Sequence, residues 1–419
     1  MKTRIFKRRS EDYKVLEKKG YSEKPLTKES GLFQKIEPNK PGGPKQFGGT
    51  SGPPGFHTKK SKQPGKIKSY FLTKHSPLAY FGLEILNNIG FNTPKARFVA
   101  SNLAVKEVEG YIPIAAFIHN KDEYGNEIIP PDIKDDKYLL KIHSKYELDF
   151  KNQCIIDRDT GKKYKISGNL FSADIGARLT ADGDFQPERL NVGLVKRGDR
   201  FYTHLIDKEQ VMFNGESYEG ASVDPAVKTS ELFSNTKRDQ QLFIINKTEK
   251  SLDNNEFDRI FVNSRTLPSF NNNENVKKIS KKYISNFRET ANSAIAYFEK
   301  KYPGELKKFE DREKIRSKLA DEVIARLALD INDDEKNALK EIIMEDLRGP
   351  YYDNCCEISE NELTDDVLIN TIVQDQAAEL KALGIASMSV LLNELKEFLG
   401  AEYDRLQGKD PNVKDKTIK

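Results

Sequence analysis

Apolar residues change their spacing along the chain, so that the first half predicts mainly strands and the last third predicts helices. Three short apolar runs in the first half favour strands: 66–74, 96–100 and 110–120. Between the first two runs, a helix with one buried face is predicted by apolar residues three or four positions apart: Leu78, Phe81, Ile85 and Ile89. Gly90 is the expected C-cap of this helix. The order is strand-rich, then mixed, then helical, which indicates an α+β protein.

A β-hairpin is expected near the middle of the chain. Its strands are two apolar runs, 191–195 and 200–206, and the residues between them include Gly198-Asp199, a typical two-residue turn. With that turn, the register of the hairpin sets Asn191 close to Ile206. The polar residues that flank the two strands therefore meet at the open end of the hairpin.

Helical spacing is found once in the middle of the chain and throughout its last third. The expected helices cover 170–179, 276–298, 315–327, 364–383 and 387–406. Asn332 and Glu335 have the spacing of a capping box, so one more helix should begin there and end at Gly349-Pro350. The interval 214–275 shows no regular spacing and predicts irregular structure.

Composition changes this picture only slightly. Apolar residues make up 37% of the 419 residues and charged residues 32%, and the mean hydropathy is −0.68, so we expect a long polar surface. No apolar stretch approaches the roughly 20 residues that cross a bilayer. The basic N-terminus lacks the apolar segment of a secretory signal. Three cysteines, Cys154, Cys355 and Cys356, are too few for a disulfide scaffold, which favours a soluble protein in a reducing compartment.

The charge is distributed unevenly. Residues 1–75 hold 19 Lys and Arg against 6 Asp and Glu, whereas the remainder holds 50 against 59. A basic segment on an acidic body favours a polyanionic partner, such as a nucleotide, an inositol phosphate or an anionic lipid, and a solvated arm is the alternative. The lysines with the strongest claim to such a partner are Lys59, Lys60, Lys62, Lys66 and Lys68. A nucleic-acid partner is disfavoured, because no recognised nucleic-acid motif is present.

Phosphoryl transfer requires a phosphate cradle, a cation on the phosphates, metal ligands and a carboxylate that orients the nucleophile. Gly48, Gly49 and Gly52 lie in a Gly/Pro-rich segment whose backbone N–H groups could approach phosphates, although such a cluster is more often a plain loop. Lys74 ends the strand 66–74, and Glu84 lies on the helix that follows. A strand lysine paired with a helix glutamate holds the cation over the phosphates in kinases; an ordinary surface pair is the alternative.

The metal site is expected at the open end of the hairpin. Asn191 begins its first strand and Asp207 follows its second, so an amide oxygen and a carboxylate converge there. Such hard oxygen ligands suit Mg²⁺ or Mn²⁺. Asp182 and Asp184 lie just upstream, and either could accept the proton of an incoming hydroxyl. The alternative is a polar loop beside a structural hairpin.

Two runs carry a resemblance to a known superfamily. GLEILNNIGFNTPKARFV and GDFQPERLNVGLV…HLIDKEQ resemble the helix-then-strand element and the catalytic region of atypical protein kinases, those similar to HipA and to phosphoinositide kinases. The resemblance covers about residues 31–215 and implies a bilobal protein-kinase-like fold with a mainly helical C-terminal region. It also implies Lys74 as the nucleotide lysine, Glu84 as its partner, Asp184 as the catalytic carboxylate, and Asn191 with Asp207 as metal ligands.

The activity implied is an ATP- and Mg²⁺- or Mn²⁺-dependent kinase acting on a protein hydroxyl or a phosphorylated small molecule, with an inositol polyphosphate as a potential regulator. No His-Arg-Asp tripeptide precedes the catalytic loop, and Lys208 follows Asp207 where typical kinases have Phe. A pseudokinase, or a module that binds inositol phosphate or phosphoinositide, is the alternative. The Lys- and Asn-rich composition resembles effectors that intracellular bacteria inject into host cells, which implies secretion and peripheral membrane association.

The resemblance and the composition together divide the chain into four expected parts. These are a basic arm (1–30), an N-lobe (31–119), a C-lobe with a helical supplement (120–350) and a helical extension (351–419). The five histidines appear scattered, with no pair at the helical spacing of metal ligands. His204, inside the hairpin, is expected to be structural, and Cys355-Cys356 an inert pair.

Overall fold

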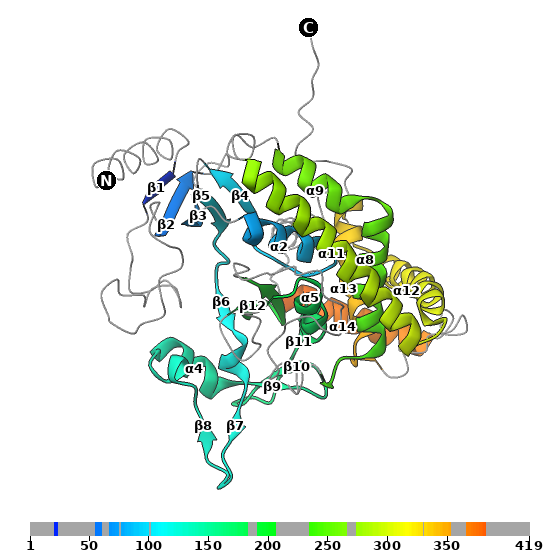
Figure 1. Ribbon diagram of the computed structural model, residues 1–419. Helices are drawn as coiled ribbons and strands as arrows, with labels where there is room; N and C mark the ends of the chain where they lie inside the picture. Colours follow the sequence, from blue (N-terminus) through cyan, green and yellow to red (C-terminus); the bar gives the residue numbers. More distant parts are fainter. Residues whose placement is uncertain are drawn as a thin grey trace.

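The computed structural model describes ten ranges of the chain: 21–23, 55–60, 67–74, 77–99, 102–182, 191–206, 234–265, 274–329, 331–352 and 366–382. Over these ranges the protein is α+β. Two large sheets lie beside a group of long helices, which is the C-terminal part of the described chain (Figure 1). This architecture is compatible with the expected two-lobe arrangement.

The first sheet has five strands joined only by antiparallel pairs, in the order β1-β2-β3-β5-β4. Its strands are β1 (Tyr21–Glu23), β2 (Gly55–Lys60), β3 (Ile67–Lys74), β4 (Ala96–Val99) and β5 (Asn102–Lys106). Helix α2 (Pro77–Asn88) connects β3 to β4. Phe81, Ile85 and Ile89 are buried as expected, and Gly90 adopts a φ of +106° at the end of the helix.

The second sheet has six strands in the order β6-β12-β13-β11-β10-β9. Its strands are β6 (Tyr111–Pro113), β9 (Tyr146–Asp149), β10 (Cys154–Asp157), β11 (Lys163–Ser167), β12 (Val192–Arg197) and β13 (Arg200–Leu205). Only the β11–β13 pair among them is parallel. Phe117, Tyr146, Tyr164 and Phe201 pack edge to face against one another or tilted, and together form an aromatic core beside this sheet.

Shorter elements surround the second sheet. They are η2 (Ile114–Phe117), β7 (Asn120–Lys121), β8 (Glu127–Ile128), α3 (Pro131–Lys134), α4 (Lys137–Lys145), η3 (Leu170–Ser172) and α5 (Ala173–Leu179). Strands β7 and β8 form a separate two-stranded hairpin that projects from the body next to α4 (Figure 1).

The helical part begins after residue 233. Its helices are α8 (Arg238–Asp253), α9 (Glu256–Arg265), α11 (Glu274–Lys301), α12 (Glu305–Leu327), α13 (Asp333–Arg348) and α14 (Asp366–Ala382). Helix α13 begins with the expected capping box between Asn332 and Glu335 and ends at Gly349. Helix α14 packs on α12 and α13, where Ile369 and Ile372 are buried. No helix among the described residues is long and apolar enough to cross a membrane.

Two expectations about the elements were wrong. The run 110–120 is not one strand, because β6 ends at Pro113, which has no N–H to donate to a neighbouring strand, and a buried 3₁₀ turn follows. The interval 214–275 is not irregular throughout, since it contains α8 and α9. Leu242, Phe243, Ile244 and Ile245 are consecutive and all buried in α8, so this helix is enclosed on several sides and shows no spaced apolar face. The expected helix 387–406 and the pair Cys355-Cys356 lie outside the described residues.

Candidate functional site

The hairpin expected from the sequence is formed by β12 and β13. Arg197 pairs with Arg200 across a turn in which Gly198 has a φ of +55°. At the other end, the Ile206 N–H donates to the Asn191 carbonyl at 2.9 Å, so Asn191 lies opposite Ile206. The expected register is therefore confirmed. Asp207 follows Ile206 in the sequence and lies outside the described residues.

The hairpin occupies the middle of the second sheet, where β13 is held on both sides by β12 and β11. All six residues of β13 are buried. His204 is among them, and burial, with smaller contributions from Arg197 and Lys106, lowers the pKa of its imidazole to about 3. The ring is therefore neutral at physiological pH, in agreement with its expected structural role. A support of this kind limits movement of the residues at either end of the strands.

The turn end of the hairpin is fixed by a buried ionic network. The Arg200 guanidinium donates two bonds to the Asp346 carboxylate, at 2.6 and 2.7 Å, and a third to Glu379 at 2.7 Å. Lys165 also reaches Asp346 at 3.3 Å. Burial alone would raise the pKa of Asp346, but Arg200 and Lys165 hold it below its usual range. The network ties β13 and β11 to α13 and α14.

Of the two candidate catalytic carboxylates, the structure describes one. Asp182 lies after the end of α5, only 1% exposed, and its N–H donates to the Ala177 carbonyl at 2.9 Å. A carboxylate so deeply buried is poorly placed to meet the hydroxyl of an incoming protein or small molecule. Asp184 lies outside the described residues.

The predicted lysine and glutamate lie on consecutive elements, strand β3 of the first sheet and helix α2. Lys74 is the last residue of β3 and pairs with Asn102 of β5. Glu84 lies on α2, and burial raises the pKa of its carboxyl to about 7, against a smaller opposing effect from Lys95. At neutral pH this carboxyl is therefore close to half protonated.

The remaining predicted binding residues lie mostly on or before this sheet. Gly48, Gly49, Gly52, Lys62 and Lys66 are outside the described residues. Lys59 and Lys60 are the last two residues of β2, and Lys68 is the second residue of β3. The register pairs Lys59 directly with Lys68, so the two positions share one face of the sheet.

Three residues that sequence reasoning missed also come together. His119 and His143 are not scattered: their rings stack with centroids 4.1 Å apart at 11°, and Glu127 is hydrogen-bonded to His119. These three residues could hold a metal ion. The intervals of 8 and 16 residues between them follow no helical or strand period, so only the fold reveals the group. A mixed His/Glu set in a polar, turn-rich interval was the one available signal.

No protein-family model matches this chain, and no curated protein or solved structure is similar to it at a significant level. The candidate site is therefore described from the register of the β12–β13 hairpin and from the burial and charge of the predicted residues. Of the residues predicted for the nucleotide, metal and catalytic roles, the structure describes Asn191, Asp182 and Glu84, together with the backbone position of Lys74.

Proposed function

We propose that the protein is an ATP- and metal-dependent kinase that transfers the γ-phosphoryl group to a protein hydroxyl or a phosphorylated small molecule. Asn191 and Asp207 would bind Mg²⁺ or Mn²⁺, and Lys74 would contact the phosphates with Glu84 as its partner. This division of roles follows the protein-kinase arrangement, in which an amide and a carboxylate share the metal ions and a lysine of the third strand is paired with a helix glutamate.

The observation that carries the proposal is the hydrogen bond between the Ile206 N–H and the Asn191 carbonyl. It closes the open end of a buried hairpin with Asn191 on one side and the residue before Asp207 on the other. A divalent ion needs at least two such oxygen donors within a few ångströms, about 2.0–2.6 Å from the ion. The register fixes the backbone of Asn191, one proposed donor. Asp207, the other proposed donor, is the residue after Ile206 in the sequence.

The order of elements in the first sheet also supports the proposal. Lys74 ends the third strand, and the next element is the helix that carries Glu84. A raised pKa near 7 means that a nearby cation would shift Glu84 toward its ionised form, because an opposite charge favours the carboxylate. If the Lys74 ammonium contacts both the phosphates and the Glu84 carboxylate, binding of Mg²⁺–ATP would favour ionised Glu84. Ionised Glu84 would in turn favour binding.

We assign the role of catalytic carboxylate to Asp184 rather than to Asp182. The side chain of Asp182 is enclosed by protein, whereas a general base must come within about 3 Å of the substrate hydroxyl. The comparison of Asp184→Asn with Asp182→Asn separates the two roles. Loss of transfer with retained folding is expected for Asp184, and loss of folding stability for Asp182.

A polyanion such as an inositol polyphosphate is proposed as a regulator bound by the first sheet. The paired positions Lys59 and Lys68 bring two basic residues to one face of β2–β3, and Lys60, the next residue of β2, belongs to the opposite face. Two or more cations at this spacing favour a multiply charged phosphate ligand over a singly charged one.

The test is phosphoryl transfer from labelled ATP by the full chain with Mg²⁺ or Mn²⁺, with and without inositol hexakisphosphate. Asp207→Ala is compared with Asp199→Ala, because Asp199 lies at the turn end of the same hairpin and pairs with Lys162 on the surface. We expect Asp207→Ala to lose transfer and the metal-dependent ATP stabilisation, and Asp199→Ala to keep both. Equal behaviour of the two variants contradicts the metal assignment.

A pseudokinase gives a different result in the same experiment. The wild-type chain would then show metal-dependent stabilisation by ATP, abolished by Asp207→Ala, and no transfer under any of the conditions. Absence of both stabilisation and transfer in the wild-type chain overturns the nucleotide site itself.

A further inference from the structure

The group of His119, Glu127 and His143 joins three elements that are separate in sequence. His119 directly precedes β7, Glu127 begins β8, and His143 lies in the last turn of α4. His143 is buried, whereas the Glu127 side chain is 37% exposed. The group thus lies where the projecting β7–β8 hairpin meets the body of the protein (Figure 1).

Hydrogen bonds on the outer side of both rings determine which nitrogen faces inward. His119 Nε2 lies 2.9 Å from the Tyr146 carbonyl oxygen, and His143 Nδ1 lies 3.3 Å from the Ala116 carbonyl oxygen. A carbonyl oxygen only accepts, so each imidazole must donate from that nitrogen. Because these outer bonds occupy one nitrogen of each ring, the other two, His119 Nδ1 and His143 Nε2, face the Glu127 carboxylate. This is the outer-shell arrangement that orients histidine ligands at metal sites.

The inward atoms converge on a common point. His119 Nδ1, His143 Nε2 and a Glu127 carboxylate oxygen lie within 4.8 Å of one another. His143 Nε2 is 3.5 Å from Glu127 Oε1 and is a buried atom with no hydrogen-bond partner. Leaving such an atom unsatisfied costs about 1–3 kcal/mol, so the inward nitrogen is an independent sign of a missing ligand.

We propose that His119, Glu127 and His143 form a binding site for a Zn²⁺-class transition-metal ion. Two imidazole nitrogens and one carboxylate oxygen match a three-ligand zinc site with a fourth position open to water. Imidazole suits Zn²⁺, Cu²⁺, Ni²⁺ and Fe²⁺ and disfavours Mg²⁺, so this site differs in chemistry from the oxygen site proposed for the nucleotide metal. The ion would replace the hydrogen bond that links His119 to Glu127 in the metal-free chain.

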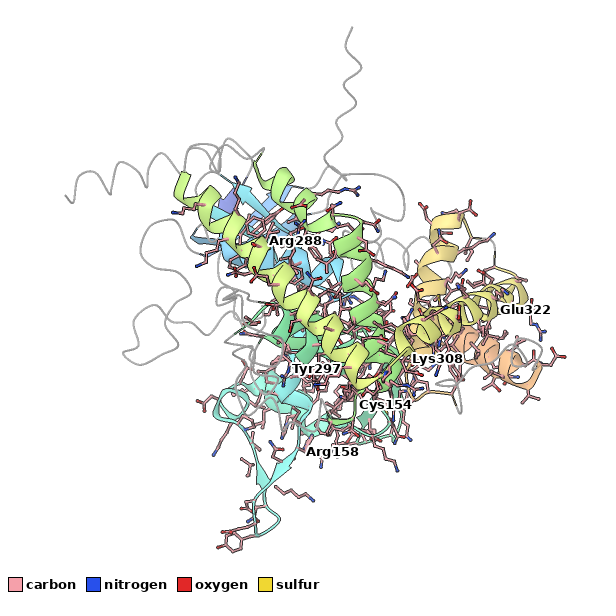
Figure 2. The ribbon with its side chains drawn as sticks, turned by 45° about the vertical axis from the view of Figure 1, so that its right-hand side comes forward. Cys154, Arg158, Arg288, Tyr297, Lys308 and Glu322 are labelled. Atoms are coloured by element: carbon pink, nitrogen blue, oxygen red, sulfur yellow. The ribbon has the colours of Figure 1, made fainter. Side chains whose placement is uncertain are left out.

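One side chain competes with the metal. The Arg158 guanidinium lies 3.1 Å from His119 Nδ1 and 3.7 Å from Glu127 Oε1, and it is close to the base of the projecting hairpin (Figure 2). The side chain is 41% exposed and already within 4.0 Å of the Glu147 carboxylate. Rotation of the Arg158 side chain toward Glu147 would move the guanidinium charge away from His119 Nδ1 and Glu127 Oε1. Arg158→Ala should therefore strengthen metal binding.

The consequence of binding is structural. The two β7–β8 strands have two residues each and pair only with one another in the described chain, so their hydrogen bonds give them little stability. A metal held by both sides of the hairpin and by α4 would restrain it against the body. Cleavage at the exposed hairpin tip, near Tyr124, should become slower when the ion is bound.

The experiment measures Zn²⁺ and Co²⁺ binding to the full chain with Cys355 and Cys356 replaced by Ser. Nucleotide is omitted, and excess Mg²⁺ is present to occupy oxygen-ligand sites. Equilibrium dialysis should give one tightly bound Zn²⁺ per chain, and Co²⁺ should show the visible absorption of a four- or five-coordinate nitrogen–oxygen site. Glu127→Gln should weaken binding at least tenfold, and Arg158→Ala should strengthen it. Glu123→Gln, at an exposed position between β7 and β8, is the matched control that should leave Zn²⁺ affinity within twofold of wild type.

His119→Gln serves as the second ligand variant. Its side chain is 7% exposed and that of His143 is 2% exposed, so circular dichroism checks that each variant folds. The proposal is overturned if the tightest Zn²⁺ binding is less than tenfold stronger than nonspecific Zn²⁺ binding to the protein surface. It is also overturned if Glu127→Gln and His119→Gln both bind Zn²⁺ like wild type. A cobalt spectrum with sulfur-to-metal charge transfer also overturns it, since the proposed ligands contain no sulfur.

Discussion

The two ends of the β12–β13 hairpin show opposite uses of polar residues. At the turn end, the Arg200 guanidinium is matched by Asp346 and Glu379 in a buried network that joins two strands to two helices. At the open end, the register is held by main-chain bonds, in which the Ile206 N–H donates to the Asn191 carbonyl. The turn end thus depends on particular side chains for its structure, whereas a main-chain hydrogen bond sets the register of the open end.

This difference separates structural charges from candidate ligands. A buried ion pair that is broken leaves an uncompensated charge, so its residues cannot be exchanged singly. A ligand site must be able to lose and regain its ion, so the fold around it has to be maintained by other contacts. The open end of the hairpin meets that condition, and so does the His119 group, whose rings are held by outer hydrogen bonds to backbone carbonyls.

The largest effect on stability is expected for Asp346→Asn at the turn end. The change leaves Arg200 buried with half of its bidentate partner, and we expect a loss of about 3–5 kcal/mol in the free energy of unfolding, measured by urea denaturation. Asp375→Asn is the matched control, because Asp375 also faces Lys165 but is half exposed, at 3.7 Å. It should cost less than about 1 kcal/mol. Similar losses for the two variants would mean that the turn end is not the structural anchor.

Gly193→Ala should have the next largest effect, in the middle of the hairpin. A Cβ atom at this position of β12 would lie 2.6 Å from the Ile112 carbonyl oxygen and would also overlap the Tyr111 ring, so β6 would have to move away. Overpacking of this kind costs about 1–3 kcal/mol. Amide hydrogen exchange should accelerate in β6 more than in β13. Unchanged exchange in β6 would contradict the tight β6–β12 contact.

A pH effect is expected from His204, which lies between the two ends. Its folded pKa, about 3, is below the usual value of about 6.5, so the unfolded chain binds the proton first as pH falls. The stability contributed by the neutral ring is therefore present above pH 6.5 and is lost as pH falls toward 3, with a slope of at most about 1.4 kcal/mol per pH unit. His204→Leu should flatten the denaturation midpoints between pH 7 and 4 relative to wild type. Parallel curves for the two proteins would mean that the pH dependence of stability comes from a group other than His204.

The smallest effect on stability, and a large one on the proposed function, is expected for Asn191→Ala. The main-chain bond to Ile206 does not involve the replaced side chain, so the free energy of unfolding should change by no more than about 0.5–1 kcal/mol. The stabilisation by Mg²⁺–ATP or Mn²⁺–ATP should disappear, as measured by thermal denaturation. Asn191→Asp keeps an oxygen donor and should retain part of it. A loss of several kcal/mol without ligand would instead assign Asn191 a structural role.

The extent to which the sequence predicted the fold depended on the range of the interactions. The hairpin register was predicted correctly because Gly198-Asp199 constrains it within a few residues. The α2 face, the capping box at Asn332 and the end of α13 at Gly349 depend on neighbours three or four positions apart and were also confirmed. Helix α8 was missed because neighbouring helices and α5 enclose it, so its apolar residues show no one-sided spacing.

The same distinction between local and long-range contacts applies to the candidate sites. Asn191 opposite Ile206 could be predicted from local turn geometry, whereas the kinase roles of Lys74, Glu84, Asp184 and Asp207 stay predictions. The His119 group could not be predicted, because its members belong to three elements and meet only when the β7–β8 hairpin docks on α4. The Arg200–Asp346 network joins residues 146 positions apart and was equally invisible in the sequence.

The sequence by itself determined the α+β class, the turn and register of the central hairpin, and the ends of its well-capped helices. Each of these follows from backbone sterics and contacts between residues that are close along the chain. The tertiary structure alone decided which charges are buried and which histidines share a point in space. Burial and convergence depend on how separate elements pack, and desolvation then sets the charge state of residues such as Glu84 and His204.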